Sequence, residues 1–268
     1  MKNKKIISLT VFFVVLVLVG ILGLSKLFET SWQNENQISN SLGTSPDIYQ
    51  ISDMGAFPFI TMDEYLSINS NYNNLPQVIE VTDNMISYDE SAVIGGTALE
   101  AICRGEDFRN LKFVIYPENR EFKNKTGAII KLNPIYTGFY EEKFVNSSRI
   151  KKSYYYQVDA ITKEVISLRY TLTENFDKGM QTLIVENPVE YAKEIAYALG
   201  YKNLKAYFAL TDDYVAYGKA HRVDFLIDEN QSITIGFNSY DDTFLFMKNV
   251  AEISDYHENL IENGISLE

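Results

Sequence analysis

An uncharged apolar run near the amino terminus, Ile6 to Leu24, constrains this chain more than any other feature of its sequence. Its 19 residues would span about 28 Å as an α-helix, close to the ~30 Å hydrocarbon core of a bilayer. Lys2, Lys4 and Lys5 precede the run, and the positive-inside rule keeps that end in the cytoplasm. The sequence therefore predicts a single-pass anchor in the cell membrane, with a cytoplasmic N-terminus and an extracytoplasmic C-terminal region.

A cleaved signal peptide is the alternative interpretation of the same run. The run is longer than a usual signal-peptide core, and Ser25 to Glu29 lacks a cleavage site with alternating small residues. A lipoprotein is disfavoured because Cys103, the only cysteine, lies far from the run. A single cysteine also excludes an intramolecular disulfide and a Cys-based zinc site. An uncleaved anchor is the favoured interpretation.

The charge distribution limits the partners of the region outside the membrane. The chain has a net charge of −12, but four of its 24 basic residues and none of its 36 acidic residues lie in the first 26 positions. The rest of the chain therefore carries a net charge of −16. Such a surface repels nucleic acids and anionic lipid headgroups, so we expect no nucleic-acid binding. Solubility is the simplest explanation of the acidity.

Composition divides the chain into three parts. Residues 1–28 contain the cytoplasmic tip and the anchor, and residues 29–56 are rich in Asn, Gln and Ser, which is typical of a polar spacer. Residues 57–268 contain the apolar periodicities of a folded region, which we expect to be extracytoplasmic. This region either forms one unit or divides into two small modules, 57–180 and 181–268.

The folded region predicts an α+β fold with antiparallel sheet packed against a few helices. Capping and stop signals predict helices from Thr97 to Gly105, from Pro188 to Leu199 after the cap Asn187, and from Asn249 to Gly264. Strand patterns without strict βα alternation occupy the stretches between them. The expected strands are 75–86, 111–116, 128–132, 154–161, 164–170, 206–210, 220–227, 232–237 and 243–247.

A short echo supports the two-module interpretation. Val158-Asp159 and Val223-Asp224 each lie in a predicted strand that leads through a polar turn into another strand. Two helix-plus-sheet modules in tandem would explain this echo, and so would chance.

No catalytic, cofactor or metal signature stands out. The chain has no G-x-S-x-G elbow, no P-loop and no dinucleotide fingerprint. His221 alternates with apolar residues and is expected to be structural, whereas His257, beside Tyr256, could be exposed. Cys103 is expected to be a buried thiol. We therefore predict no catalytic residue, no cofactor and no metal ligand.

Two weaker patterns have simple structural explanations. Gly95-Gly96 before the Thr97 helix could present backbone N–H groups to an anion, but two glycines there are usually a turn. The acidic pairs at 212–213, 228–229 and 241–242 suggest calcium, but Ile233 stands where an EF-hand loop needs glycine and Ser239 where it needs glutamate. Hairpin turns explain these acids better.

The strongest candidate for a recognition surface is a set of tyrosines. Tyr154, Tyr155 and Tyr156 are consecutive, and Tyr170 lies in the next predicted strand. Consecutive strand residues point to opposite faces, so at least one of the three is expected to face solvent. Tyrosine on a strand suits recognition because it is large and can hydrogen-bond at its tip. Ordinary sheet packing is the alternative explanation.

The segment Tyr156-Gln-Val-Asp-Ala-Ile-Thr-Lys-Glu-Val165 resembles the strand–turn–strand signature of PepSY-type extracytoplasmic domains, Tyr-x-Val-x-Asp-Ala-x-Thr-Gly-Glu-Val. Val158 and Asp159 are adjacent here, and Lys163 replaces the turn glycine. The helix from Pro188 with its following strands is also similar in layout to such a domain. The resemblance covers about ten residues well, and implies a non-catalytic module that regulates a protease or another envelope protein.

Three functions fit these observations. The favoured one is a membrane-anchored binding or regulatory protein that acts on another envelope protein. The second is an envelope enzyme whose carboxylate and tyrosine site is dispersed in the sequence, and paired carboxylates with shifted pKa values in a cleft would favour it. The third is a structural subunit of a membrane complex.

Overall fold

The computed structural model describes residues 57–68, 77–103, 106–124, 126–143, 145–146, 149–173, 185–214, 218–238, 242–251 and 254–267. The predicted anchor (1–28) and spacer (29–56) lie outside these residues, as does the expected module boundary at 180/181. No helix among the described residues is long and apolar enough to span a bilayer.

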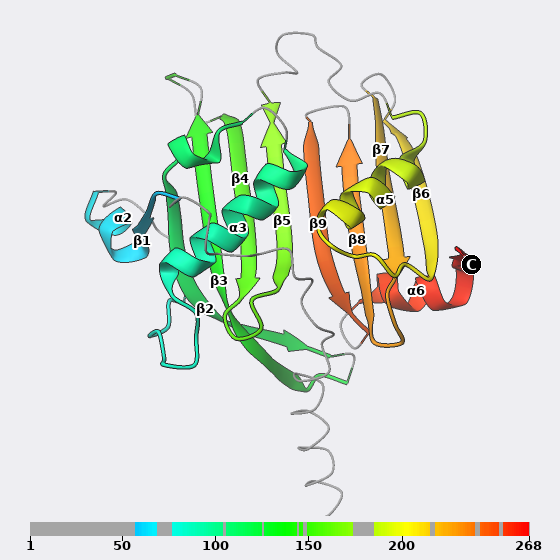
Figure 1. The fold of residues 1–268 in the computed structure, drawn as a ribbon, viewed down its shortest axis with the longest axis horizontal. Helices are drawn as coiled ribbons and strands as arrows, with labels where there is room; N and C mark the ends of the chain where they lie inside the picture. The colour runs from blue at the N-terminus through cyan, green and yellow to red at the C-terminus, as the bar shows by residue number, and fades with distance from the viewer. Residues whose placement is uncertain are drawn as a thin grey trace, which may run out of the picture. The chain divides into compact units, whose positions relative to one another are not determined.

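The folded region is α+β, as predicted, and is built on one ten-stranded sheet in the order β1-β2-β3-β4-β5-β9-β8-β7-β6-β10 (Figure 1). Every adjacent pair is antiparallel except β1 and β2. The strands are β1 Phe59–Thr61, β2 Phe113–Lys123, β3 Ile129–Lys143, β4 Ile150–Asp159, β5 Val165–Leu172, β6 Ala206–Tyr214, β7 Gly218–Leu226, β8 Gln231–Asn238, β9 Thr243–Val250 and β10 Ile265–Ser266. The helices are α2 Met62–Ile68, α3 Tyr88–Ile102, the 3₁₀ turn η2 Phe108–Asn110, α5 Pro188–Ala198 and α6 Asp255–Asn263.

The sheet consists of two halves with the same order of elements. In the first half α3 precedes the meander β2 to β5, and in the second half α5 precedes the meander β6 to β9. The last strands of the two meanders, β5 and β9, pair in the middle, so one sheet runs through both halves. The Val-Asp echo does not reflect this repetition, because Asp159 ends the third strand of its meander whereas Asp224 lies within the second strand.

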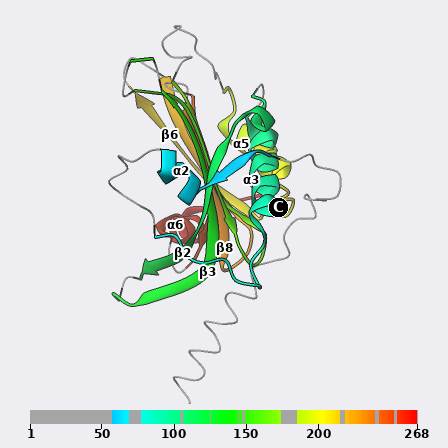
Figure 2. The same cartoon turned by 90° about the vertical axis from the view of Figure 1, so that its left-hand side faces the viewer.

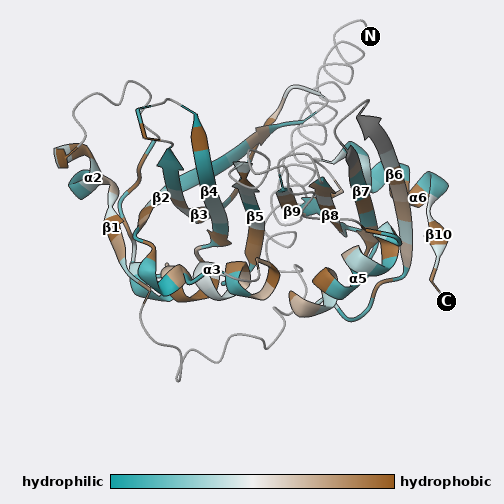
Figure 3. Cartoon of the chain, turned by 90° about the horizontal axis from the view of Figure 1, so that it is seen from above, coloured by the Kyte–Doolittle hydropathy of each residue, from teal (hydrophilic) through white to brown (hydrophobic). Residues whose placement is uncertain are grey.

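Helices cover the two faces of the sheet differently. α3 and α5 lie on one face, here called the front face, and α2 and α6 lie on the opposite, back face (Figure 2). Seen from above, α3 and α5 follow one another along the front, while α6 lies behind the second half beside β10 (Figure 3). The front face therefore holds the main core.

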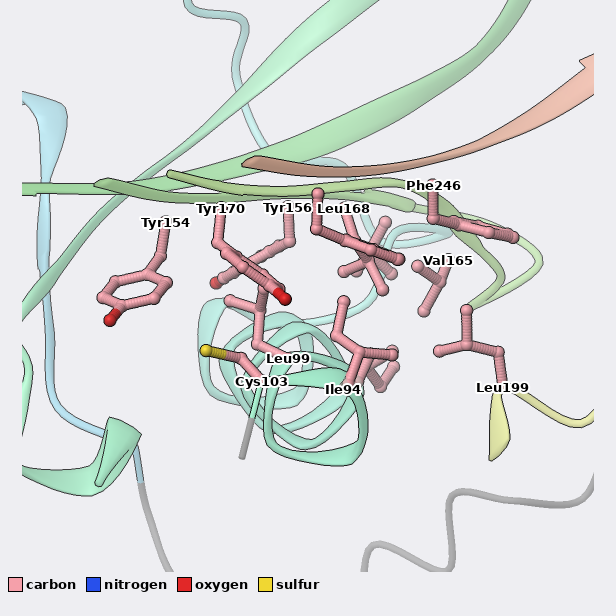
Figure 4. Packing of buried hydrophobic residues seen from close by; sticks show 14 of the residues in the cluster. Ile94, Leu99, Cys103, Tyr154, Tyr156, Val165, Leu168, Tyr170, Leu199 and Phe246 are labelled. Carbon is pink, nitrogen blue, oxygen red and sulfur yellow. The ribbon is translucent and has the colours of Figure 1, made fainter. Parts of the chain in front are cut away.

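Tyr156 explains why α3 contains two glycines. The ring of Tyr156 lies between α3 and β3, and a Cβ atom at Gly95 or at Gly138 would overlap it. A side chain at Gly96 would likewise overlap the ring of Phe57. The glycines thus let α3 approach the sheet, where its apolar side chains pack against those of β4, β5 and β9 (Figure 4).

This packing corrects the predicted start of the helix. α3 begins at Tyr88, and its cap is Ser87, whose hydroxyl accepts a hydrogen bond from Glu90 N at 3.1 Å. Ser87-x-x-Glu90 carries the same type of capping signal as Thr97-x-x-Glu100, and it lies ahead of the apolar residues that α3 buries. Gly95 and Gly96 are therefore helix-interior residues and not an anion-binding turn, and Gly105 lies outside the described residues.

Two strand predictions also need correction. Residues 77–86 form no regular strand, and only Val78 makes an isolated bridge, to Glu118. The strand expected over 111–116 does not end there, because β2 continues through Pro117 to Lys123. The Pro117 carbonyl accepts a hydrogen bond from Ile79 N at 3.0 Å, on the side of β2 away from β3. The backbone N of Pro117 points to the same side, so proline removes no hydrogen bond to β3.

The second half follows its sequence signals more closely. α5 begins at Pro188 with Asn187 as its cap, and four strands follow in the expected places. The last helix differs: β9 runs through Asn249, and Ser254 caps α6. Asn249 does not cap a helix because its buried amide donates a hydrogen bond to Thr234 in the neighbouring strand.

An ion pair marks the junction of the halves. Lys248 Nζ of β9 lies 2.7 Å from Glu164 Oε2 in the turn before β5, and both side chains are buried. Toward the other end of the β5–β9 pair, the rings of Tyr170 and Phe244 stack across the two strands. Buried charges strongly disfavour an arrangement that separates them, so this pair favours one register between the halves.

Candidate interaction surface

Most of the tyrosines predicted to form a recognition surface are part of the core. Tyr154, Tyr156 and Tyr170 point to the front face and are 1%, 1% and 6% exposed. They are buried because α3 covers β4 and β5 on that side, as Figure 4 shows. These three residues therefore do not form an exposed surface. Tyr155 points to the back face and is half-buried, so it alone of the four reaches a surface.

Tyr154 belongs to a network of charges at the edge of the core. Its hydroxyl donates to Glu106 Oε2 at 2.6 Å, and Lys152 Nζ lies 3.1 Å from both oxygens of Glu106 and 3.4 Å from Glu142 Oε2. Burial acts to lower the pKa of Lys152, but the two glutamates outweigh it and raise that pKa. The two glutamates thus stabilise the charged form of Lys152, which is a stabilising arrangement and not one poised for proton transfer.

The cysteine and the histidines also have structural surroundings. Burial, with Asp242 and Glu106 nearby, raises the pKa of Cys103 to about 12, so the thiol stays protonated. His221 is buried against Phe237, and its Nδ1 lies 3.0 Å from Thr211 Oγ1. The sequence left open whether His257 is exposed; α6 buries it, with Nε2 2.9 Å from the carbonyl oxygen of Glu229.

The acidic pair at 228–229 lies in a turn. Asp228 Oδ1 accepts a hydrogen bond from Asn230 N at 2.8 Å, which closes the turn between β7 and β8. Asp241 lies outside the described residues. Within the part of the chain that the structure describes, no group of three or more His, Cys, Asp or Glu side chains could hold a metal ion.

A polar chain crosses the back face beside Tyr155. Gln157 Nε2 donates to Thr137 Oγ1 at 3.3 Å, and Thr137 Oγ1 donates to Glu118 Oε1 at 2.5 Å. The chain thus runs from amide to hydroxyl to carboxylate across β4, β3 and β2, and we call it the open relay. Burial raises the pKa of Tyr155 to about 12, and a hydrogen bond with the Thr137 side chain only partly opposes this shift.

A set of side chains on the back face surrounds the junction of the two halves. Tyr155 pairs directly with Arg169, which in turn pairs with Leu245 of β9. The next row is Gln157, Ser167 and Met247. Arg169 is exposed and the other five are half-buried. We call these residues the central patch: Tyr155, Gln157, Ser167, Arg169, Leu245 and Met247.

The described helices of the back face lie to either side of the central patch. α2 packs on β1 and β2, and its Tyr65 meets Phe139 of β3 edge-on. α6 packs mainly on β6 and β7. The helix that packs on β4 and β5 is α3, which lies on the front face (Figure 2). Among the described helices, none covers the middle of the back face as α3 covers the middle of the front.

A second polar chain crosses the back face of the second half under α6. Asn249 Nδ2 donates to Thr234 Oγ1 at 2.5 Å, and Thr234 Oγ1 donates to Asp224 Oδ1 at 2.6 Å. The order is again amide, hydroxyl and carboxylate, and we call this chain the covered relay. Arg222 Nε lies 3.2 Å from Asp224 Oδ2, and the Arg222 guanidinium lies over the ring of Tyr256 in α6.

Comparison of the chain with protein-family models, curated proteins and solved structures finds no match.

The sequence predicted Tyr155 but missed the other members of this face. Asp224 between Val223 and Phe225 was a usable signal, since a charged residue at an alternate position of an apolar strand marks the second face of the sheet. The contacts from Thr137 to Gln157 and Glu118 had no such signal, because they depend on the register of three strands.

Proposed function

We propose that this chain is a membrane-anchored, extracytoplasmic binding or regulatory protein that acts on another envelope protein through the central patch. The observation that carries the proposal is the adjacent Tyr155 and Arg169 on the middle of the back face, which none of the described helices covers. Tyrosine and arginine are enriched among the residues that dominate binding energy at protein interfaces. Leu245 and Met247 add apolar area beside them.

The surroundings of Tyr155 suit recognition better than catalysis. The open relay fixes Gln157 and Thr137, and the raised pKa of Tyr155 disfavours the phenolate that a catalytic base or nucleophile would need. A rigid sheet that presents fixed polar groups loses little conformational entropy on binding. A partner can therefore gain both hydrogen bonds and apolar contact from the same patch.

Two features of the sequence support placement in the cell envelope. The apolar run from Ile6 to Leu24, preceded by lysines, has the properties of an anchor with a cytoplasmic N-terminus. The PepSY resemblance points to a regulatory module of the same compartment. Lys163, which replaces the turn glycine of that signature, has φ 66°, a conformation to which glycine is better suited.

The test compares paired variants of the full-length protein recovered from gently solubilised membranes. Tyr155→Ala combined with Arg169→Ala should reduce a co-purifying membrane partner at least tenfold. Tyr197→Ala is the control, because Tyr197 is an exposed tyrosine on α5. It should leave recovery of the partner unchanged. No stoichiometric partner for the wild type, or undiminished recovery with the double variant, would refute the proposal.

A further inference from the structure

β2 and β3 continue beyond the rest of the sheet as a two-stranded ribbon. β4 pairs with β3 no further than Ile135, whereas residues 120–123 of β2 and 129–132 of β3 pair only with each other among the described strands. The ribbon sweeps below β4 and β5 in Figure 1, and it bends toward the side of α2 and α6 in Figure 2. It therefore lies across the end of the back face that is nearest to Gln157 and Met247 of the central patch.

The two sides of the ribbon differ in exposure. One side continues the face of β2 that carries Glu118, and its four side chains are half-buried: Arg120, Phe122, Ile130 and Leu132. The alternating four side chains are exposed: Glu121, Lys123, Ile129 and Lys131. Burial lowers the pKa of Arg120, and the nearby negative charges of Asp159 and Glu164 oppose this. The half-buried side, here called the inner side, therefore faces the ends of β4 and β5 beside the central patch.

The space over the central patch has the width of one helix. The described helices of the back face pack mainly at its sides, α2 on β1 and β2 and α6 on β6 and β7. The patch itself lies on β4, β5 and β9, and two strand spacings separate the outer two of these strands by about 10 Å. An α-helix with its side chains is about 10 Å wide. Helices also cover the front face of the same sheet, so one helix is the occupant that fits this space best.

Arg169 gives this space a positive charge within an acidic molecule. Its side chain is exposed, and within the described part of the chain it has no ion pair or hydrogen bond. The chain beyond residue 26 carries a net charge of −16, so most of its surface repels an acidic partner. A carboxylate that approaches Arg169 can instead form a bidentate pair with the guanidinium. Tyr155 and Leu245, which flank Arg169, favour apolar side chains around that carboxylate.

We propose that the central patch and the inner side of the ribbon together bind one amphipathic α-helix of the partner, with a carboxylate of that helix on Arg169 and apolar side chains against the ribbon. This site rests on the proposed function, because the central patch forms its floor. Arg169 lies beside Tyr155, and the distance along β4 from Tyr155 to its end at Asp159 is about 13 Å, or roughly two helical turns. The helix therefore carries one acid within its apolar stripe and apolar residues about two turns away.

The probe is a blocked, fluorescent peptide of alanine and leucine, kept helical by a side-chain staple, with one glutamate in the middle of its leucine stripe. The comparison peptide carries lysine at that position. Full-length protein in neutral detergent should bind the glutamate peptide saturably, by fluorescence anisotropy, and at least tenfold more tightly than the lysine peptide. Arg169→Glu should reverse this preference. Lys202→Glu, the same change at an exposed lysine outside the patch, should leave the preference within threefold of the wild type.

Two adjacent isoleucines on opposite sides of the ribbon test its part in the site. Ile130 is half-buried on the inner side, whereas Ile129 is 66% exposed on the outer side. Ile130→Ala should weaken binding of the glutamate peptide at least fivefold, and Ile129→Ala should weaken it less than twofold. A photo-reactive amino acid at position 130 should give an adduct with the peptide, and the same amino acid at position 129 should give none. The adduct decides if Ile130→Ala loosens the ribbon itself.

These measurements distinguish the helix site from the proposed function. No saturable binding of the glutamate peptide, an unchanged preference in Arg169→Glu, or adducts of equal yield at positions 129 and 130 would each overturn the helix site. The proposed function would still stand if Tyr155→Ala with Arg169→Ala reduced the co-purifying membrane partner. Undiminished recovery of that partner with the double variant would refute both.

Discussion

The open and covered relays have the same chemistry in different surroundings. Each leads from an amide through a threonine hydroxyl to a carboxylate across three adjacent strands of one face. In the covered relay Asp224, Thr234 and Asn249 are all buried, beneath and beside α6. In the open relay only Thr137 is buried, and Glu118 and Gln157 remain half-buried.

This difference separates a structural role from one in binding. A buried carboxylate must keep its partners, because losing one leaves a desolvated charge. A half-buried carboxylate can exchange a lost partner for water. The covered relay is therefore part of the stability of the second half, whereas the open relay can contribute to a surface at little cost to the fold.

The largest expected effect comes from removing the carboxylate of each relay. Asp224→Ala should lower the free energy of unfolding by about 3 kcal/mol, because it leaves Thr234 and Arg222 without their buried partner. Glu118→Ala should lower it by about 1 kcal/mol. Urea unfolding of the full-length protein in detergent, followed by circular dichroism, measures both. Equal losses would remove the distinction between the relays.

The central threonines allow the same substitution in both places. Thr234→Val should cost about 2 kcal/mol, because Asp224 loses a hydrogen bond that water cannot replace under α6. Thr137→Val should cost about 1 kcal/mol or less, because Glu118 can turn to solvent. The same unfolding measurement decides, and a larger loss for Thr137→Val would contradict the account.

The pH dependence of stability tests the burial of Asp224. Burial raises the pKa of Asp224 above its ordinary value of 3.8, and the hydrogen bond from Thr234 and the positive charge of Arg222 only partly oppose this. A carboxyl group that binds its proton more tightly in the folded state stabilises the fold most below pH 3.8. That contribution is lost as the pH rises through the folded-state pKa.

The matched variant for this test is Asp224→Asn. The stability of the wild type relative to Asp224→Asn should decline as the pH rises from about 3.8 toward neutrality. Urea midpoints at a series of pH values measure this difference. If the stability of the wild type relative to Asp224→Asn stayed constant or increased with pH, the pKa of Asp224 would not be raised in the folded state.

The smallest expected effect lies in the turn between β4 and β5, in the half that carries the open relay. Lys163 has φ 66° and pairs with Glu90 at 2.6 Å. Lys163→Gly relieves the left-handed conformation but loses this largely exposed pair, so its net effect should be within about 1 kcal/mol. Lys163→Ala loses the pair without that relief and should be about 1 kcal/mol less stable than the glycine variant. A more stable alanine variant would contradict this reading of the turn.

The fold could be predicted from the sequence where signals were local. Asn187-Pro188 correctly opened α5, and the β4–β5 hairpin was correctly located because its polar turn separates two apolar strands. Local signals misled where two capping sequences lie close together, as at Ser87 and Thr97. They also misled at Asn249, which could cap a helix but instead hydrogen-bonds to Thr234 from within a strand.

The candidate surface was only partly predictable, because it depends on which face of the sheet each helix covers. Alternation showed that Tyr154 and Tyr156 point away from Tyr155, but not which side α3 would bury. The central patch also joins β4, β5 and β9, and the pairing of β5 with β9 has no local signal.

The most direct test of the central claim is photo-crosslinking in intact membranes. A photo-reactive amino acid at position 155 or 157 of the full-length protein should give one adduct with the same membrane partner. The same amino acid at position 256, on α6 beside the covered relay, should give no adduct. Adducts from position 256 but not from 155 or 157 would contradict the claim that the open part of the back face is the binding surface.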